Sequence, residues 1–192
     1  LGRLLAGIAH ELNTPLGIIN SAGGTIERIL QKELDSVIEF CCRAPEDIYN
    51  LYLNFLNNST DNQDNAYKRM LRRTYYKALE DKGIEVDEEI IEKLVDLGYH
   101  GEADELTELV SNPKNIPAIQ AAYSIYILHK SVGMIKVSAE KASHVILALK
   151  TYSHMDTNKT PVPHDVVKDL ETVLTLYHNQ IKYGIDIIRE YE

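Results

Sequence analysis

The sequence is poor in the residues that build disulfide-bonded, aromatic-rich or strand-and-turn proteins. Of its 192 residues none is tryptophan, two are phenylalanine and two are cysteine, while glycine and proline number 10 and 6. Glycine and proline interrupt helices and occupy tight turns, so their scarcity favours long helices. The two cysteines, Cys41 and Cys42, are adjacent, and adjacent cysteines rarely bridge each other. We therefore expect free thiols and a reducing compartment, the cytoplasm.

Long apolar runs are also missing. No segment approaches the roughly 18 consecutive apolar residues that a membrane span needs, and the chain has no basic-then-apolar leader for export. We expect no direct membrane contact from this chain. Its first residue is Leu1 rather than methionine, which favours a piece of a longer protein. The location would then be cytoplasmic, either free or as the cytoplasmic part of a membrane-anchored protein.

Negative charge is concentrated in one stretch. The net charge is −9, and residues 80–108 hold twelve acidic residues against two lysines, Lys82 and Lys93. The rest of the chain is close to neutral, which argues against a broad basic face for nucleic acid. A short basic cluster, KRMLRR at residues 68–73, is expected to be the solvated face of a helix. No nucleic-acid partner is expected.

Two long stripes of apolar or small residues repeat at steps of three or four, the spacing of one helix face. The first comprises Leu5, Ile8, Leu12, Leu16, Ile19, Gly23, Ile26, Leu30, Leu34, Val37 and Cys41. The second follows Pro117 and comprises Ala118, Ala122, Ile125, Val132, Ile135, Ala139, Ala142, Ile146, Leu149 and Ser153. Each stripe covers about 36 residues, or roughly 54 Å of helix.

Helices of matched length indicate an all-α fold built on an antiparallel hairpin. Each apolar face is wider than one neighbouring helix can cover, so two helices alone would leave apolar surface in water. Pairing two copies of the chain solves this, and we expect a homodimer that forms a four-helix bundle.

The stripes and breaks divide the chain into four parts. Residues 1–42 would form the first bundle helix, 43–115 a helical insert, 116–157 the second bundle helix, and 158–192 a tail. Within the insert, turn signals separate four short helices, predicted at Glu46–Leu56, Asn65–Lys82, Asp87–Leu97 and Glu102–Val110. The tail predicts a helix from Val166 to Lys182 and a short strand around Ile185 and Ile187.

The stretch AGIAHELNTPLGII, residues 6–19, carries the most unusual chemistry. At 100° per residue His10 points away from the stripe that contains Ile8, and Thr14 lies one turn further on the same face. Gly17 leaves that face open, and Glu11 is adjacent to His10 in sequence. Pro15 removes a helix hydrogen bond to the carbonyl of Glu11, which favours a bend and costs roughly 3 kcal/mol.

The segment HELNTPL resembles the H-box of sensor histidine kinases, the phosphotransfer helix of two-component signalling. SAEKASHVILALKTYSH is similar to the second helix of that dimerisation domain. The tail TPVPHDVVKDLETVLTLYHNQIKYGIDIIREYE resembles the opening helix and strand of the ATP-binding domain that follows it. The three segments together cover over half of the chain. The acid, threonine and proline occupy the same positions as in the family's H-box pattern.

The resemblance implies a role for each polar residue of the H-box. His10 would be the phosphoacceptor, and a neutral imidazole nitrogen suits that nucleophilic role. Glu11 would act as a base or fix the ring tautomer, and Thr14 would orient water for dephosphorylating the partner. Asn13 is a weaker candidate. The bend at Pro15 would let the helix shift between kinase and phosphotransfer states.

The resemblance also implies partners and substrates. The phosphoryl group would come from ATP with Mg²⁺, and would pass from His10 to an aspartate on the receiver domain of a response regulator. That regulator would bind near His10 and Thr14, with residues from Ala148 to Tyr152 of the second helix lining the site. The chain would be a protein-histidine kinase fragment, from the cytoplasmic part of a sensor.

The chain departs from the family pattern in two places. The asparagine-bearing and glycine-rich boxes that hold Mg²⁺–ATP are not present up to Glu192, so we expect no cofactor bound to this fragment and no self-phosphorylation. The insert of about 70 residues replaces a short turn. It would emerge at the end of the hairpin far from His10, as a cap on the bundle's base or as an acidic docking surface for another protein.

Two other interpretations stay open. The chain could be a non-catalytic helical dimerisation and interaction scaffold with His10 as a surface residue. It could also be a stand-alone histidine phosphotransfer bundle, which predicts a monomer and conflicts with the tail. The six other histidines, His100, His129, His144, His154, His164 and His178, have no metal-ligand spacing, and we expect no metal site.

Overall fold

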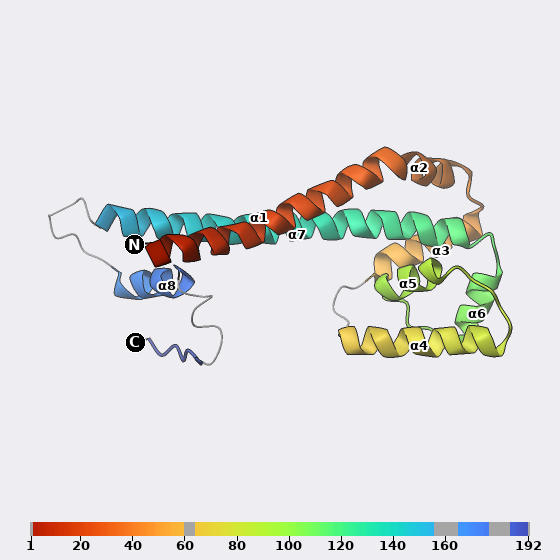
Figure 1. Cartoon of the computed structure of the whole chain (residues 1–192). Helices are drawn as coiled ribbons and strands as arrows, with labels where there is room; N and C mark the ends of the chain where they lie inside the picture. Colours follow the sequence, from red (N-terminus) through yellow and green to blue (C-terminus); the bar gives the residue numbers. More distant parts are fainter. Residues whose placement is uncertain (1, 60–63, 156–164, 177–184, 192) are drawn as a thin grey trace. The chain divides into compact units, whose positions relative to one another are not determined.

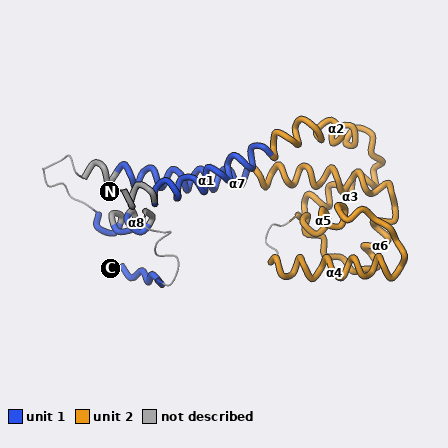
Figure 2. Tube along the Cα trace, in the orientation of Figure 1, with its two compact units in different colours: residues 1–24, 132–192 blue, residues 25–131 orange. Residues whose placement is uncertain are grey.

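The computed structural model describes residues 2–59, 64–155, 165–176 and 185–191, and these residues form eight helices and no strand (Figure 1). The all-α prediction is confirmed. The chain divides into two compact units, one of residues 1–24 with 132–192 and one of residues 25–131 (Figure 2). We call these units unit 1 and unit 2, respectively. Helices α1, Gly2–Lys32, and α7, Ile116–Met155, contribute to both units.

In unit 1, the first part of α1 lies antiparallel to the last part of α7 (Figure 2). Ile8 of α1 is buried together with Val145 and Ala148 of α7, and Leu12 and Leu149 pack against them. A residue near the start of one helix therefore meets residues near the end of the other. The predicted antiparallel hairpin is confirmed here by side-chain packing.

The face of α7 that is buried in unit 1 coincides only in part with the predicted apolar stripe. Its buried residues are Ser138, Ala142, Val145 and Ala148, of which Ala142 belongs to the stripe, and the stripe residue Leu149 packs against the same cluster. The bulkier stripe members Val132 and Ile146 are exposed, with 58% and 56% of their surface accessible. Small side chains such as Ser138 and Ala142 let two helices approach closely, whereas Val132 and Ile146 keep more than half of their surface exposed within the described residues.

Unit 2 contains α2, Leu34–Arg43, and the four helices of the insert: α3, Glu46–Asn58; α4, Asn65–Asp81; α5, Glu88–Asp96; and α6, Ala103–Ser111. The four predicted insert helices all exist, with ends within two residues of the expectation. Asp87 caps α5 by accepting a hydrogen bond from the backbone N–H of Glu89 at 3.0 Å. Gly83 and Gly98 have positive φ and end α4 and α5, the backbone conformation that glycine adopts without strain.

The core of unit 2 joins the insert to the first turns of α7. Ile91, Leu94 and Leu106 from the insert and Ile119 from α7 are completely buried, and Val37 of α2 belongs to the same cluster. The compact unit thus begins at residue 25 rather than at the predicted insert boundary of 43. The reason is that these parts of the long helices bury their apolar residues against the insert.

The first bundle helix is interrupted, contrary to the prediction of one helix over residues 1–42. A single turn residue, Glu33, separates α1 from α2. Its carboxylate forms an ion pair with Arg28 and accepts a hydrogen bond from the Ser124 hydroxyl at 2.6 Å. These contacts place the junction against α7 inside unit 2. Cys41 and Cys42 of α2 are free and exposed, so Cys41 is not a buried stripe residue.

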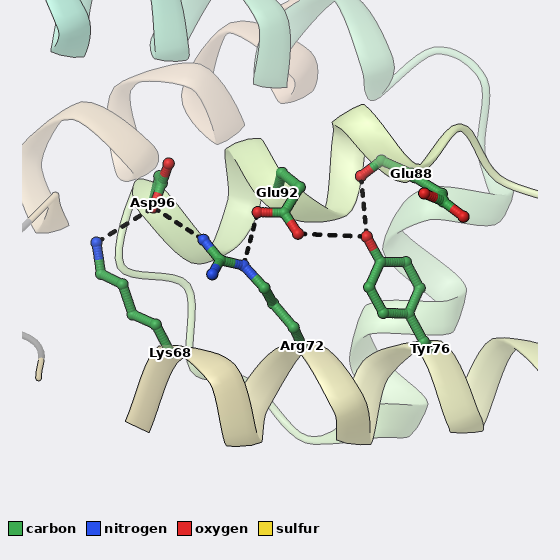
Figure 3. A network of polar contacts seen from close by, with 6 residues as sticks. All are labelled: Lys68, Arg72, Tyr76, Glu88, Glu92 and Asp96. Atoms are coloured by element: carbon green, nitrogen blue, oxygen red, sulfur yellow. Dashed lines mark hydrogen bonds and ion pairs between the residues drawn. The ribbon is translucent and has the colours of Figure 1, made fainter. Parts of the chain in front are cut away.

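The prediction that residues 68–73 form a solvated face is wrong for two of the four basic residues. Lys68 is buried, and its ammonium group lies 3.2 Å from the Asp96 carboxylate. Arg72 forms ion pairs with Glu92 at 2.6 Å and Asp96 at 3.4 Å (Figure 3). The acidic face of α5 therefore forms ion pairs with the basic face of α4.

The tail differs from the prediction in one of its two elements. The expected helix is α8, Val166–Leu176, and the rest of its predicted length, up to Lys182, lies outside the described residues. Residues 185–191 form no strand, because a strand needs a hydrogen-bonded neighbour and none of the described residues supplies one. They lie against α8 instead, where Arg189 pairs with Glu171 at 2.6 Å.

Candidate functional site

His10 lies in the third turn of α1, a helix that packs through its other face. At 100° per residue, Ile8 and His10 point in nearly opposite directions, and Ile8 is buried against α7 while His10 is exposed. The expectation that the imidazole faces solvent is therefore confirmed. The packing of Ile8 against Val145 and Ala148 fixes which face of α1 is turned outward.

Thr14 and Pro15 modify the backbone one turn after His10. The Thr14 hydroxyl donates a hydrogen bond to the backbone carbonyl of His10 at 3.2 Å. Such back-bonding often bends helices slightly. Helix α1 nevertheless continues through Pro15 to Lys32. Pro15 is itself buried, so packing of its ring offsets part of the lost backbone hydrogen bond.

The other residues around His10 leave its face open. Asn13 and Thr14 are exposed and Glu11 is half-buried. A side chain added at Gly17 would meet no atom within 4 Å. The outward face of this helix segment thus carries an imidazole, a hydroxyl and an amide beside a position without a side chain. A globular partner could reach the imidazole without displacing another part of unit 1's described residues.

The predicted regulator-facing residues of the second helix lie at the expected end of α7. Ala148, the first of them, packs beside Ile8 and is therefore close to the turn that carries His10. The side chain of Tyr152 lies outside the described residues. His10 and Ala148 are thus brought to one end of the hairpin, as antiparallel pairing requires.

The described residues offer no site for a metal ion or a membrane span. No group of three histidine, cysteine, aspartate or glutamate side chains among them could hold a metal, and no helix among them has the length and apolarity to cross a bilayer. The Nδ1 atom of His100 forms a hydrogen bond with the Gly98 carbonyl oxygen, 2.8 Å away. His129 and His144 are exposed on α7.

Sequence reasoning missed the polar network of the insert, although a signal was present. Lys68, Arg72 and Tyr76 recur at every fourth position, and so do the acidic residues Glu88, Glu92 and Asp96. Two rows of matched spacing and opposite charge indicate two antiparallel helices that face each other. In the structure the Tyr76 hydroxyl lies 3.4 Å from both the Glu88 carbonyl and the Glu92 carboxylate (Figure 3).

No protein-family model, no curated protein and no solved structure matches this chain.

Proposed function

We propose that the chain is the dimerisation and phosphoacceptor domain of a sensor histidine kinase, and that His10 is the residue that becomes phosphorylated. The observation that carries the proposal is the exposure of His10 on a helix anchored through its opposite face by Ile8. The resemblance of HELNTPL to the family's H-box supplies the chemical assignment. An exposed imidazole on a fixed helix face can be presented in turn to two different partner domains.

His10 would act as the nucleophile. Its unprotonated ring nitrogen would form a bond to the γ-phosphorus of ATP while the bond from that phosphorus to the leaving ADP oxygen breaks. Glu11 would accept the proton or hydrogen bond of the other ring nitrogen and so keep the attacking nitrogen basic. ATP and Mg²⁺ would be bound by a separate ATP-binding domain. The phosphoryl group would then pass to a carboxylate of a response regulator.

Thr14 would serve the reverse reaction, in which the regulator's phosphoryl group is hydrolysed. Its hydroxyl is exposed one turn from His10 and is held by the hydrogen bond to the His10 carbonyl. A hydroxyl at that place can accept a hydrogen bond from a water molecule while it donates to the carbonyl. Asn13, also exposed, is the second candidate for this role.

The proposal includes a homodimer, and uncovered apolar residues of unit 1 support it. Val132 and Ile146 on α7 and Leu16 on α1 each expose about half of their surface or more. Covering such residues in a second copy of the hairpin would produce the four-helix bundle of the family. The apolar residues Val166, Leu170 and Val173 of α8 are likewise exposed, which fits a helix that belongs to an adjoining ATP-binding domain.

The proposal is tested by labelling with radioactive ATP in the longer protein that includes the ATP-binding domain. The His10→Gln variant should take up no acid-labile phosphate. His144→Gln, which changes an exposed histidine of α7 in the same unit, should be labelled like the unmodified protein. Undiminished labelling of His10→Gln would contradict the proposal and favour a non-catalytic interaction scaffold.

Thr14→Ala separates the two reactions at this site. It should leave labelling of His10 within about twofold, because the hydroxyl touches no atom that changes bonds in that step. It should slow dephosphorylation of the regulator by about 10²-fold, the usual value of a positioned polar group in proton-transfer catalysis. Equal effects on both reactions would show that Thr14 only stabilises the helix.

A further inference from the structure

A cleft of about 1190 Å³ opens in unit 2, and none of the residues assigned to phosphotransfer lines it. It lies between the C-terminal half of α3, the loop of residues 97–101 and α6. The half-buried Leu51, Tyr99 and Leu109 supply accessible apolar and aromatic surface, and the buried Phe55 and Leu97 also line the cleft. The rings of Phe55 and Tyr99 meet edge to face, with centroids 6.3 Å apart. This surface suits the apolar body of a ligand.

The acidic residues of the cleft are two glutamates of α6. Glu105 and Glu108 line it, and neither carboxylate forms an ion pair within the residues that the structure describes. No lysine or arginine lines the cleft. The remaining polar lining includes His100 and five asparagines, Asn54, Asn57, Asn58, Asn112 and Asn115. The asparagine amides are neutral and offer both donors and acceptors, so the two glutamates give the cleft its negative charge.

The walls of the cleft are held in place by hydrogen bonds to the rest of unit 2. The hydroxyl of the buried Tyr75 donates to the Gly101 carbonyl at 2.8 Å and ties the loop to α4. The Asn115 amide donates to the Leu109 carbonyl at 2.9 Å and closes the C-terminal end of α6. The Tyr99 ring also packs against Tyr75, with centroids 6.1 Å apart. A site held in this way requires little reorganisation when a ligand enters.

We propose that this cleft binds a small organic cation, an ammonium group carried on an apolar or aromatic body. The ammonium group would lie between Glu105 and Glu108, and the body would cover the half-buried Leu51, Tyr99 and Leu109. Anionic ligands are disfavoured because no cationic side chain lines the cleft. The acidic character of residues 80–108 attracts a cation to this part of the surface. The inference does not depend on the role of His10.

The proposal is tested with 4-phenylbutylamine as the probe and the uncharged 4-phenylbutan-1-ol as its control. Binding is followed on the isotope-labelled chain by nuclear magnetic resonance, with the amides of Gly98 and Gly101 as reporters inside the cleft wall. The amine should shift these two signals and bind at least about tenfold more tightly than the alcohol, because two charge contacts near water contribute about fivefold each.

Two double variants of equal net charge locate the binding site. Glu105→Gln with Glu108→Gln should weaken amine binding by at least about tenfold. Glu80→Gln with Glu85→Gln, two exposed acids outside this cleft, should weaken it by less than about twofold. The proposal is overturned if the alcohol binds as tightly as the amine, or if both double variants weaken amine binding equally. It is also overturned if the amine at roughly 10 mM, a concentration that would reveal even millimolar binding, shifts neither glycine signal.

Discussion

The exposed apolar residues Val132 and Ile146 of α7 allow a prediction of how strongly one substitution should weaken the proposed dimer. Burial of a whole isoleucine side chain stabilises by about 1.5–3 kcal/mol. Ile146 is already partly covered within its own chain and exposes 56% of its surface, so a partner could gain about 1 kcal/mol from it. In a symmetric dimer the residue occurs twice. Ile146→Ser should therefore cost about 2 kcal/mol of dimer stability, or about 30-fold in Kd.

The assay is sedimentation equilibrium over a range of protein concentrations. Met70→Ser provides the matched control, because Met70 also exposes 56% of its surface but lies on α4 in unit 2. Its Kd should change by less than about twofold, as is usual for a surface substitution away from an interface. Circular dichroism checks that both variants keep their helices. Combining Ile146→Ser with Val132→Ser should weaken the dimer by about 10³-fold if the two contributions add.

Two results would refute this reasoning. The first is an unmodified chain that is monomeric at about 100 µM, since burial of two such rows should give a Kd well below that value. The second is a dimer whose Kd responds to Met70→Ser as strongly as to Ile146→Ser. In either case Val132 and Ile146 of α7 would not form a contact between copies of this chain.

Three further predictions concern the stability of unit 2. Leu94→Ala, at a completely buried core position, should lower the free energy of unfolding by about 2–5 kcal/mol, measured by urea denaturation. Asp96→Ala should cost about 1–3 kcal/mol in the same assay, because it leaves the buried Lys68 ammonium without its partner, and Lys68→Met should restore part of that loss. Burial, with a smaller effect of Cys41, raises the pKa of Tyr52 from 10.0 to about 12. Its neutral form is therefore favoured in the folded state, and the stabilisation is complete below pH 10 and lost as the pH rises towards 12. Between pH 10 and 11 the free energy of unfolding of Tyr52→Phe should therefore fall by about 1 kcal/mol less than that of the unmodified chain.

The insert could be predicted from sequence because its signals are local. Asp87 is a capping residue followed by the apolar pairs of an amphipathic helix, and the glycines at 83 and 98 mark the ends of α4 and α5. Such signals act within a few residues and do not depend on the rest of the fold. The helix ends in this region accordingly agree with the prediction to within two residues.

Features that depend on long-range packing could not be predicted in the same way. The interruption at Glu33 involves Ser124, 91 positions further along the chain. The buried face of α7 in unit 1 includes Ser138, and hydrophobicity alone does not distinguish such a residue from one on a polar surface. The strand expected near Ile185 has no neighbour among the described residues, and alternation of apolar residues cannot supply one.

The helix face that carries His10 is the part of the candidate site that sequence predicts well. Residue spacing along a helix determines which side chains share a face, and the exposure of His10 and Thr14 with burial of Ile8 follows that rule. The cleft of unit 2 was not predicted, because Phe55, Tyr99 and Glu105 come from three separate elements. Only the fold of the insert brings them together.

The central claim is that the imidazole of His10 carries the phosphoryl group, and mapping the modified residue tests it most directly. A protein that joins this chain to an ATP-binding domain is incubated with ATP and Mg²⁺, kept at neutral pH, digested and sequenced by tandem mass spectrometry. The account predicts phosphate on the peptide that contains HELNTPL, at His10. Phosphate at a different residue, or none in a protein that hydrolyses ATP, would contradict it.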